Sequence, residues 1–251
     1  MGPMVGRLLK RAAMFTMAVL GAEAAYAVLR PAPRLEQFDP SAEFGDPNLP
    51  LLKVAVLGDS SVTAPGVSGP HEIWVSLICS RLAENRHVVL RSFALGGSRA
   101  QDVLTEQLEP ALEYGPDVVF LSVGANDAIK WVPRRKFIED LDRIVAAFAA
   151  TGAMVVQSGV GFLGSIPRLQ PPLSQMMERR AVRFDLAHRE VAARHGTAVV
   201  DQRSDDRLAW HRDRSLWAED YFHVSAAGHA RWAETVWRTV GPLLDGAHGP
   251  G

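Results

Sequence analysis

The chain has 251 residues, of which 47% are hydrophobic and 22% charged, a composition typical of a globular protein with material for a sizeable core. Its 27 basic and 28 acidic residues leave a net charge of −1, so there is no electrostatic basis for binding nucleic acid. The single cysteine, Cys79, excludes an internal disulfide and a multi-cysteine metal site.

The amino terminus differs in kind from the rest of the chain. Arg7, Lys10 and Arg11 precede an apolar run from Ala12 to Leu29, a pattern typical of a signal peptide or a membrane anchor. Ala25-Tyr26-Ala27 fits a cleavage site, whereas the run, at about eighteen residues, is just long enough for an uncleaved anchor. We favour the anchor over cleavage, and both over a helix that lies on the membrane surface.

A linker is predicted after this segment. Residues 30–50 are polar, lack periodicity and contain five prolines, Pro31, Pro33, Pro40, Pro47 and Pro50. We expect residues 1–29 to attach the chain to a membrane, residues 30–50 to be the linker, and one domain to occupy residues 51–246, outside the cytoplasm. Arg30 and Arg34 put positive charge on both flanks of the apolar run, so the charge pattern adds little to this orientation.

From residue 53 onward, apolar β-type runs alternate with helical patterns. The predicted strands are Lys53–Gly58, Val88–Ala94, Asp117–Val123, Met154–Val160 and Thr197–Asp201. The predicted helices are His71–Asn85, Arg99–Tyr114, Pro133–Thr151, Leu173–His195 and Ser225–Leu244. This alternation predicts an α/β fold of three α/β/α layers with a five-stranded parallel sheet in the flavodoxin-like order 2-1-3-4-5. The carboxyl ends of parallel strands share one edge, so loops 58–61, 95–98, 124–127 and 202–223 should meet there.

A serine and a histidine in these loops suit nucleophilic catalysis. Ser60 follows the first strand directly, and a serine hydroxyl needs a base to become a nucleophile. His223 is suited to that role near neutral pH, and Asp220, three residues earlier, can fix its tautomer. Each residue also has a structural interpretation: Ser60 as part of a turn or helix cap, and His223 as the cap of the helix near Ser225.

The same loops offer hydrogen-bond donors for an oxyanion, which acyl transfer requires. These are the backbone N–H groups of Ser60 and Gly97 and the side-chain amide of Asn126. In structural terms, Gly97 fits a turn and Asn126 a loop or cap.

Together these elements resemble the SGNH hydrolases, the family of GDSL-type esterases and lipases, over about residues 52–242. Gly58-Asp59-Ser60-Ser61 is similar to the first family block, Gly97 to the glycine of the second, Gly124-Ala125-Asn126-Asp127 to the third, and Asp220-x-x-His223 to the last. There are two departures: Ser61 stands where the family name has leucine, and the second block lacks a preceding asparagine, which leaves Gly96 as a rival to Gly97.

The resemblance implies a serine esterase that works through an acyl-enzyme, with Ser60, Asp220 and His223 as catalytic residues. It implies an oxyanion hole of Ser60, Gly97 and Asn126, and neither a metal nor an organic cofactor. The substrate would be a small-molecule, lipid or glycan acyl ester. An acyltransferase or a glycan O-deacetylase using the same site is the nearest alternative, and a non-enzymatic binding module is a third.

Five apolar residues in the rim loops are open to two interpretations. They could line an acyl pocket or anchor their loops, and the second is favoured: Trp131, Phe162, Leu163, Ile166 and Trp217. The oligomeric state cannot be inferred from the sequence.

Overall fold

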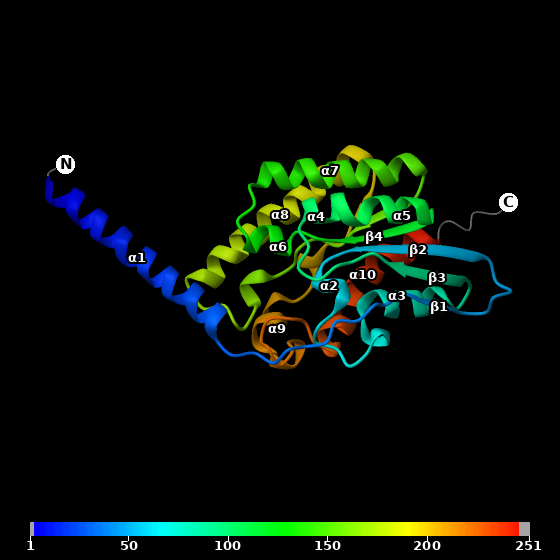
Figure 1. Cartoon of the computed structure of the whole chain (residues 1–251), viewed down its shortest axis with the longest axis horizontal. Helices are drawn as coiled ribbons and strands as arrows, with labels where there is room; N and C mark the ends of the chain where they lie inside the picture. Colours follow the sequence, from blue (N-terminus) through cyan, green and yellow to red (C-terminus); the bar gives the residue numbers. More distant parts are fainter. Residues whose placement is uncertain (1–2, 246–251) are drawn as a thin grey trace.

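Figure 1 shows the computed structural model of the chain, which describes residues 3–245. The α-helices are α1 (Pro3–Leu29), α2 (Ser60–Thr63), α3 (Trp74–Leu82), α4 (Ala100–Asp102), α5 (Leu108–Tyr114), α6 (Ala125–Ile129), α7 (Arg134–Thr151), α8 (Leu173–His195), α9 (Arg207–Arg212) and α10 (Ala226–Asp245). The strands are β1 (Ala42–Phe44), β2 (Leu51–Gly58), β3 (His87–Ser92), β4 (Val118–Ser122), β5 (Met154–Gln157) and β6 (Ala198–Val199).

The six strands form one sheet in the order β1-β3-β2-β4-β5-β6. All neighbouring pairs are parallel except β1 and β3, which are antiparallel. The register pairs Val54 with both Leu90 and Val118, so β2 is central, and its carboxyl end lies beside the end of β4. The five parallel strands therefore follow the predicted order, and the α/β prediction is confirmed.

Helices cover both faces of the sheet because the strands are apolar on both sides. Ala55 and Leu57 of β2 face one fully buried core cluster, which includes residues of α5, α7 and α8. Val54 and Val56 face the other, which includes residues of α3 and α10. The alternation along β2 thus produces the three layers, with the helices on either side of the sheet in Figure 1.

The sixth strand comes from the stretch predicted to be a linker. β1 contains only three residues, two of them exposed, so it carries no apolar periodicity that the sequence could reveal. Contacts elsewhere in the fold hold it in place. Phe38 packs on the core beside α3, its N–H donates to Thr63 O, and Ser41 Oγ accepts the N–H of Ser92. The ordered domain therefore includes part of residues 30–50.

Helix α1 projects from one end of the domain (Figure 1). Of the residues that the structure describes, none form a helix long and apolar enough to cross a membrane. Some side chains of the predicted anchor, those of Ala12, Ala13 and Val28 among them, lie outside the described set. The anchor and the signal segment therefore stay predictions.

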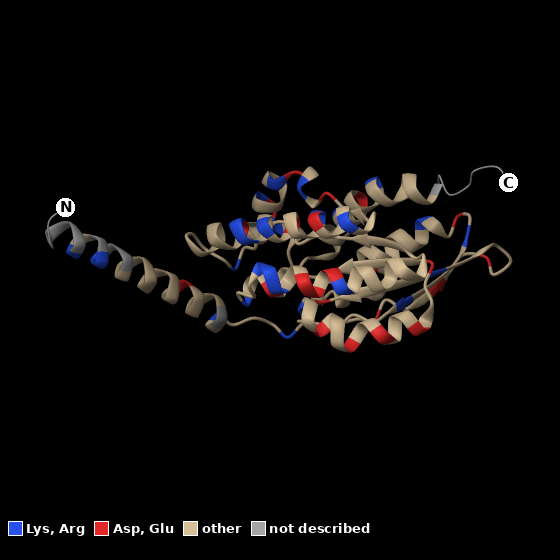
Figure 2. Cartoon of the chain, turned by 90° about the horizontal axis from the view of Figure 1, so that it is seen from above, with Lys and Arg blue, Asp and Glu red and all other residues tan. Residues whose placement is uncertain are grey.

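Charged side chains lie on the outer helices, and both signs occur side by side there (Figure 2). Cys79 lies on α3 and is fully buried, and this burial raises the pKa of its thiol. It is a small apolar residue of the core.

Candidate active site

The turn that carries Ser60 is fixed by a close approach of two strands. At Gly58 the backbone has φ = +152°, and a Cβ atom there would lie 2.0 Å from the carbonyl oxygen of Ser122 on β4. Any side chain would therefore push β2 and β4 apart, so only glycine fits. Asp59 follows, with its N–H donating to the same Ser122 oxygen, and Ser60 begins α2 at the carboxyl end of β2.

Asp59 is buried directly beside the serine. Its Oδ1 accepts the N–H of Ser61 at 2.9 Å and so caps α2, and its Oδ2 accepts from Asn126 Nδ2 at 3.0 Å. Burial raises the pKa of Asp59, although these hydrogen bonds act in the opposite direction. Asp59 therefore ties the loop after β2 to the loop after β4.

Gln107, in the helical layer beside the sheet, bonds the backbone of Gly58. Its Oε1 accepts the N–H of Gly58 and its Nε2 donates to the carbonyl of Gly58, both at 2.9 Å, and Nε2 also lies 3.1 Å from Ser98 Oγ. Gln107 is 1% exposed and ends a π-helical turn, Val103–Gln107, between α4 and α5. Such π-bulges often occur at functional sites. Sequence reasoning missed this residue, because a glutamine inside a predicted helix carries no distinctive signal.

Asp220 and His223 form the predicted pair. Asp220 Oδ2 accepts from His223 Nδ1 at 2.6 Å, while Oδ1 accepts the backbone N–H groups of Phe222 and His223, each at 2.9 Å. Burial acts to raise the pKa of Asp220, but the hydrogen bonds from His223 and Phe222 outweigh it, and the pKa lies below its ordinary value. The ionised carboxylate thus fixes the Nδ1–H tautomer, leaving Nε2 free to accept a proton.

Two other histidines of the domain are unsuited to base catalysis. His188 is fully buried, and desolvation lowers its pKa to about 4. His229 lines the same pocket as His223, but burial lowers its pKa to about 3, and its Nδ1 accepts the N–H of Trp74 at 3.4 Å. His223 combines access to the pocket with a carboxylate on its second nitrogen.

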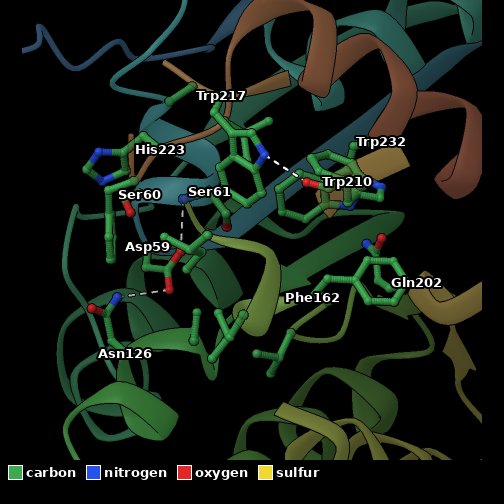
Figure 3. Close-up of a pocket in the computed structure, with 18 of the residues that line it drawn as sticks. Asp59, Ser60, Ser61, Asn126, Phe162, Gln202, Trp210, Trp217, His223 and Trp232 are labelled. Atoms are coloured by element: carbon green, nitrogen blue, oxygen red, sulfur yellow. Dashed lines mark hydrogen bonds between the residues drawn. The ribbon is translucent and has the colours of Figure 1, made fainter. Parts of the chain in front are cut away.

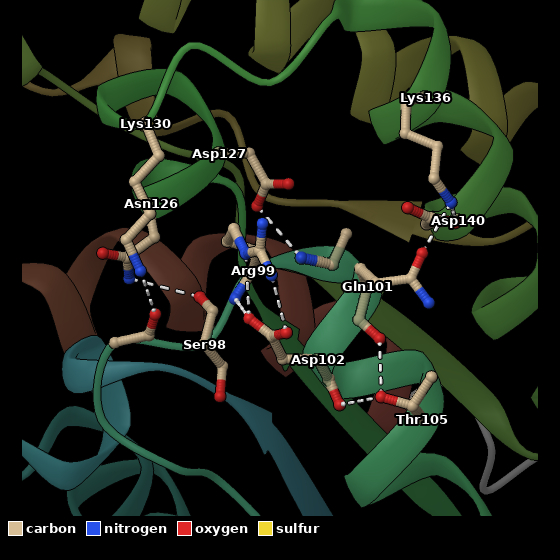
Figure 4. Close-up of polar contacts among 12 residues, drawn as sticks. Ser98, Arg99, Gln101, Asp102, Thr105, Asn126, Asp127, Lys130, Lys136 and Asp140 are labelled. Carbon is tan, nitrogen blue, oxygen red and sulfur yellow. Dashed lines mark hydrogen bonds and ion pairs between the residues drawn. The ribbon is translucent and has the colours of Figure 1, made fainter.

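Asn126, which follows β4, is bonded to the loop after β2 (Figure 3) and to the loop after β3 (Figure 4). Its Nδ2 donates to Asp59 Oδ2 at 3.0 Å and to Ser98 O at 3.2 Å. The following residue, Asp127, accepts the N–H of Ala100 at 3.0 Å, and Lys130 Nζ donates to Gly97 O at 2.9 Å. These bonds hold the loop with Gly97 against α6.

The two backbone donors predicted for an oxyanion are available. Within the described residues, no hydrogen bond uses the N–H of Ser60 or of Gly97. Gly97 has φ = +84°, which favours glycine, and open space where a Cβ would stand. At Gly96, the rival position, the Gln37 side chain occupies that space, with atoms 2.4–2.8 Å from an ideal Cβ.

Ser60, Asn126 and His223 line one pocket (Figure 3), a cavity of about 130 Å³. Asp220 lies behind His223, and neither it nor Gly97 contributes to the lining. Among the described residues, no hydrogen bond joins Ser60 Oγ to His223, and such contacts are often long before substrate binds. The fold thus brings the predicted nucleophile, base and amide to one cavity.

The rest of the pocket wall is largely apolar and aromatic. Four of the five rim residues weighed from the sequence contribute to it, namely Phe162, Leu163, Ile166 and Trp217. Trp131 does not: it is 54% exposed and stacks under the Arg180 guanidinium, 4.5 Å from the ring centre. Trp210, Trp232 and Phe222 were not predicted and also line the cavity.

Ser61, where the family name has leucine, joins a chain of hydroxyl groups. Its Oγ lies 2.7 Å from Ser122 Oγ, which lies 3.2 Å from Ser158 Oγ. Ser122 and Ser158 are both buried. The polar side chain is therefore matched by polar partners, and the departure leaves the turn intact.

The comparisons with known proteins agree with this geometry. The model of the GDSL-like Lipase/Acylhydrolase family matches residues 56–231. The chain belongs to this family. It is accordingly a serine hydrolase that acts on ester bonds. No curated protein matches the chain.

Solved structures share the fold. The crystal structure of TesA is 26% identical, with a TM-score of 0.63, over 76% of this chain and 99% of TesA. LAE5, an alpha/beta hydrolase enzyme from the metagenome of Lake Arreo, Spain, is 24% identical, with a TM-score of 0.63, over 76% of this chain and 96% of LAE5. A catalytic mutant of Axe2, an acetylxylan esterase from Geobacillus stearothermophilus, is 17% identical, with a TM-score of 0.64, over 79% of this chain and 96% of Axe2. The last two likenesses concern the fold alone.

Proposed function

We propose that the chain hydrolyses acyl esters through a covalent acyl-enzyme formed on Ser60. The observation that carries the proposal is the meeting of Ser60 and the Asp220–His223 pair at one largely apolar cavity. Ser60 Oγ attacks the ester carbonyl while His223 Nε2 takes its proton. His223 then protonates the leaving alcohol, and the acyl group stays on Ser60 until water, activated by His223, releases it as the acid.

The oxyanion is held by the N–H groups of Ser60 and Gly97 and by Asn126 Nδ2. Because Nδ2 already donates to Asp59 and Ser98, Asn126 must redirect one N–H toward the oxyanion. The bond to Ser98 is the longer of the two, so it is the one given up. Asp59 then keeps the amide oriented while the negative charge develops.

The substrate that fits best carries a short to medium apolar acyl chain. Trp217 Nε1 donates to Trp210 O at 3.0 Å, and Trp210 Nε1 donates to Asp205 at 2.8 Å, so both indoles use their polar atoms within the protein. They present ring carbons to the cavity, which suits a hydrocarbon chain better than a sugar. An apolar cavity of about 150 Å³ accommodates benzene, so we expect a preference for acyl groups of about four to six carbons.

The test is a series of p-nitrophenyl esters from acetyl to dodecanoyl, together with labelling by a serine-reactive phosphonate. We expect labelling of the wild type, none of Ser60→Ala with its fold intact, and a maximum of kcat/KM near the predicted length. Leu163→Trp should shift the maximum toward acetyl by filling the cavity, whereas Leu186→Trp, at a residue 54% exposed on α8, should not.

Other outcomes of this experiment favour the alternatives. A maximum at acetyl would favour a glycan O-deacetylase, and transfer to an added alcohol or sugar would favour an acyltransferase. An unlabelled wild type would contradict the acyl-enzyme and leave a binding module.

We also propose that α1 attaches the domain to a membrane, with the catalytic domain outside the cytoplasm. Arg7, Lys10 and Arg11 begin the helix, and Met14 and Phe15 are each 72% exposed. Such a helix combines charge attraction to anionic lipid with exposed apolar surface. The full-length protein should pellet with membranes, and an uncleaved anchor should stay in the pellet after a carbonate wash. Release of a shortened protein would favour a cleaved signal, and full-length protein left in the supernatant would contradict attachment.

A further inference from the structure

One buried arginine joins the end of α1 to the loop that carries Asp220 and His223. Arg168 is 8% exposed and lies in the loop between β5 and α8. Its guanidinium donates to three backbone carbonyls: Nε to Ala27 O at 2.5 Å, Nη1 to Asp220 O at 3.0 Å, and Nη2 to Arg30 O. The planar fork of arginine can reach acceptors on two segments at once.

The loop that Arg168 holds is strained at Tyr221. This residue has φ = +60°, the left-handed region that a bulky side chain rarely adopts. The N–H of Arg168 donates to Tyr221 O at 2.9 Å, so residue 168 bonds the two successive carbonyls of Asp220 and Tyr221. Strained turns persist where surrounding contacts over-determine them. This turn directs the N–H groups of Phe222 and His223 to the Asp220 carboxylate.

The α1 side of the contact is held at further points. The last carbonyls of a helix have no intrahelical partner, and a cation there is favourable. Glu23 Oε2 accepts the N–H of Leu173 at the start of α8, at 3.0 Å. The Arg30 guanidinium lies over the Tyr221 ring, 4.4 Å from its centre. Glu23, the charged residue inside the apolar run, therefore fixes α1 against the start of α8. Arg30, just after α1, contacts the strained turn at Tyr221.

We propose that Arg168 is a positioning residue for the catalytic pair, holding the turn at Asp220 and Tyr221 by tying it to the end of α1. The inference rests on the proposed function, because it concerns the efficiency of the Asp220–His223 pair. Without the guanidinium, the turn can relax at Tyr221 and His223 shifts relative to Ser60. Most of the pocket wall that would bind the acyl chain lies outside this turn, so the effect falls mainly on kcat.

The experiment compares Arg168→Met, Arg168→Lys and Arg134→Met in the full chain. We measure kcat and KM on the preferred ester, the rate of phosphonate labelling, and folding by circular dichroism. Arg134 is the control because its Nε also donates to a backbone carbonyl, that of Arg183, and neither residue lines the pocket. Misplacement of a catalytic group by about 1 Å costs about 10²-fold, so we expect Arg168→Met to lose about 10- to 100-fold in kcat and labelling rate, with KM within about threefold.

Arg168→Lys keeps the buried charge but cannot reach both segments with a rigid fork, so kcat should fall between the wild type and Arg168→Met. If Arg168→Met fails to fold, the kcat of the folded Arg168→Lys variant tests the inference by itself. A kcat of the folded Arg168 variants within twofold of the wild type would overturn the inference. So would a loss confined to KM, or an equal loss in Arg134→Met. An inactive, unlabelled wild type would instead overturn the proposed function.

Discussion

The two halves of the proposed catalytic site are supported in different ways. Ser60 follows a central strand, and its turn is fixed by the sheet and by the buried Gln107, which bonds both backbone groups of Gly58. His223 lies in a loop after α9, far from any strand end in sequence. Its position depends on the Asp220 carboxylate, on the Ala218 N–H that donates to its carbonyl, and on Arg168. The position of the proposed nucleophile, Ser60, is thus fixed by the core, whereas that of the proposed base, His223, depends on a few specific polar contacts.

The largest fall in kcat should come from Asp220→Asn, which changes the half of the site that depends on polar contacts. The amide oxygen can still accept the N–H groups of Phe222 and His223, which places the amide nitrogen opposite His223 Nδ1. Two donors would then face each other, so the tautomer with a proton on Nε2 is favoured and cannot act as a base. We expect kcat to fall by about 10⁴-fold with little change in the melting temperature.

The control for Asp220→Asn is Asp213→Asn, an exposed helix cap in the same segment. A kcat of Asp220→Asn within twofold of the wild type at every pH between about 5 and 9 would remove Asp220 from the site.

Asn126→Ala tests the side of the site that the sheet supports. Loss of one oxyanion donor costs about 10²- to 10³-fold in kcat, and KM should change little because the pocket wall stays in place. Asn85→Ala, after the end of α3, is the control. A rise in KM with kcat unchanged would make Asn126 a binding residue instead.

Gln107→Met tests a residue that holds the turn before Ser60 in place but does not itself take part in the proposed reaction. The variant leaves the N–H of Gly58 buried without a partner, at a cost of about 1–3 kcal/mol, while the carbonyl of Gly58 keeps its bond from the N–H of Leu95. We expect the melting temperature to fall by about 5–10 °C and kcat by about tenfold. Gln101, in the preceding helix α4, bonds Lys136 and not Gly58, so Gln101→Met should leave both quantities unchanged. A stable, fully active Gln107→Met would show that the strands alone fix the turn.

The smallest effect on activity should come from Asp127→Asn, which tests the pH dependence of stability. Burial raises the pKa of Asp127 to about 6 from 3.8, so the folded protein binds this proton more tightly than the unfolded chain. The stabilisation is complete below about pH 4 and is lost as the pH rises through about 6, and it amounts to about 3 kcal/mol.

Asp127→Asn removes this dependence but can keep the bond from the Ala100 N–H. The melting temperature of the wild type should therefore fall, relative to that of the variant, between about pH 4 and pH 7. Thermal unfolding of both proteins at several pH values measures the difference. Parallel curves would mean that Asp127 ionises normally in the fold.

The sequence by itself determined the layers and the parallel strand order, because apolar strand runs alternating with amphipathic helices leave few arrangements. It also pointed to Ser60, Asn126 and His223, since each stands in a short polar motif at an expected strand end or before the last helix. Only the tertiary structure revealed β1, whose three residues carry no periodicity. The same holds for Gln107 and Arg168, which bond backbone groups of residues 49 and 52 positions away in sequence. A side chain that bonds distant backbone atoms leaves no local pattern in the sequence, because backbone N–H and carbonyl groups are the same whatever the residue type.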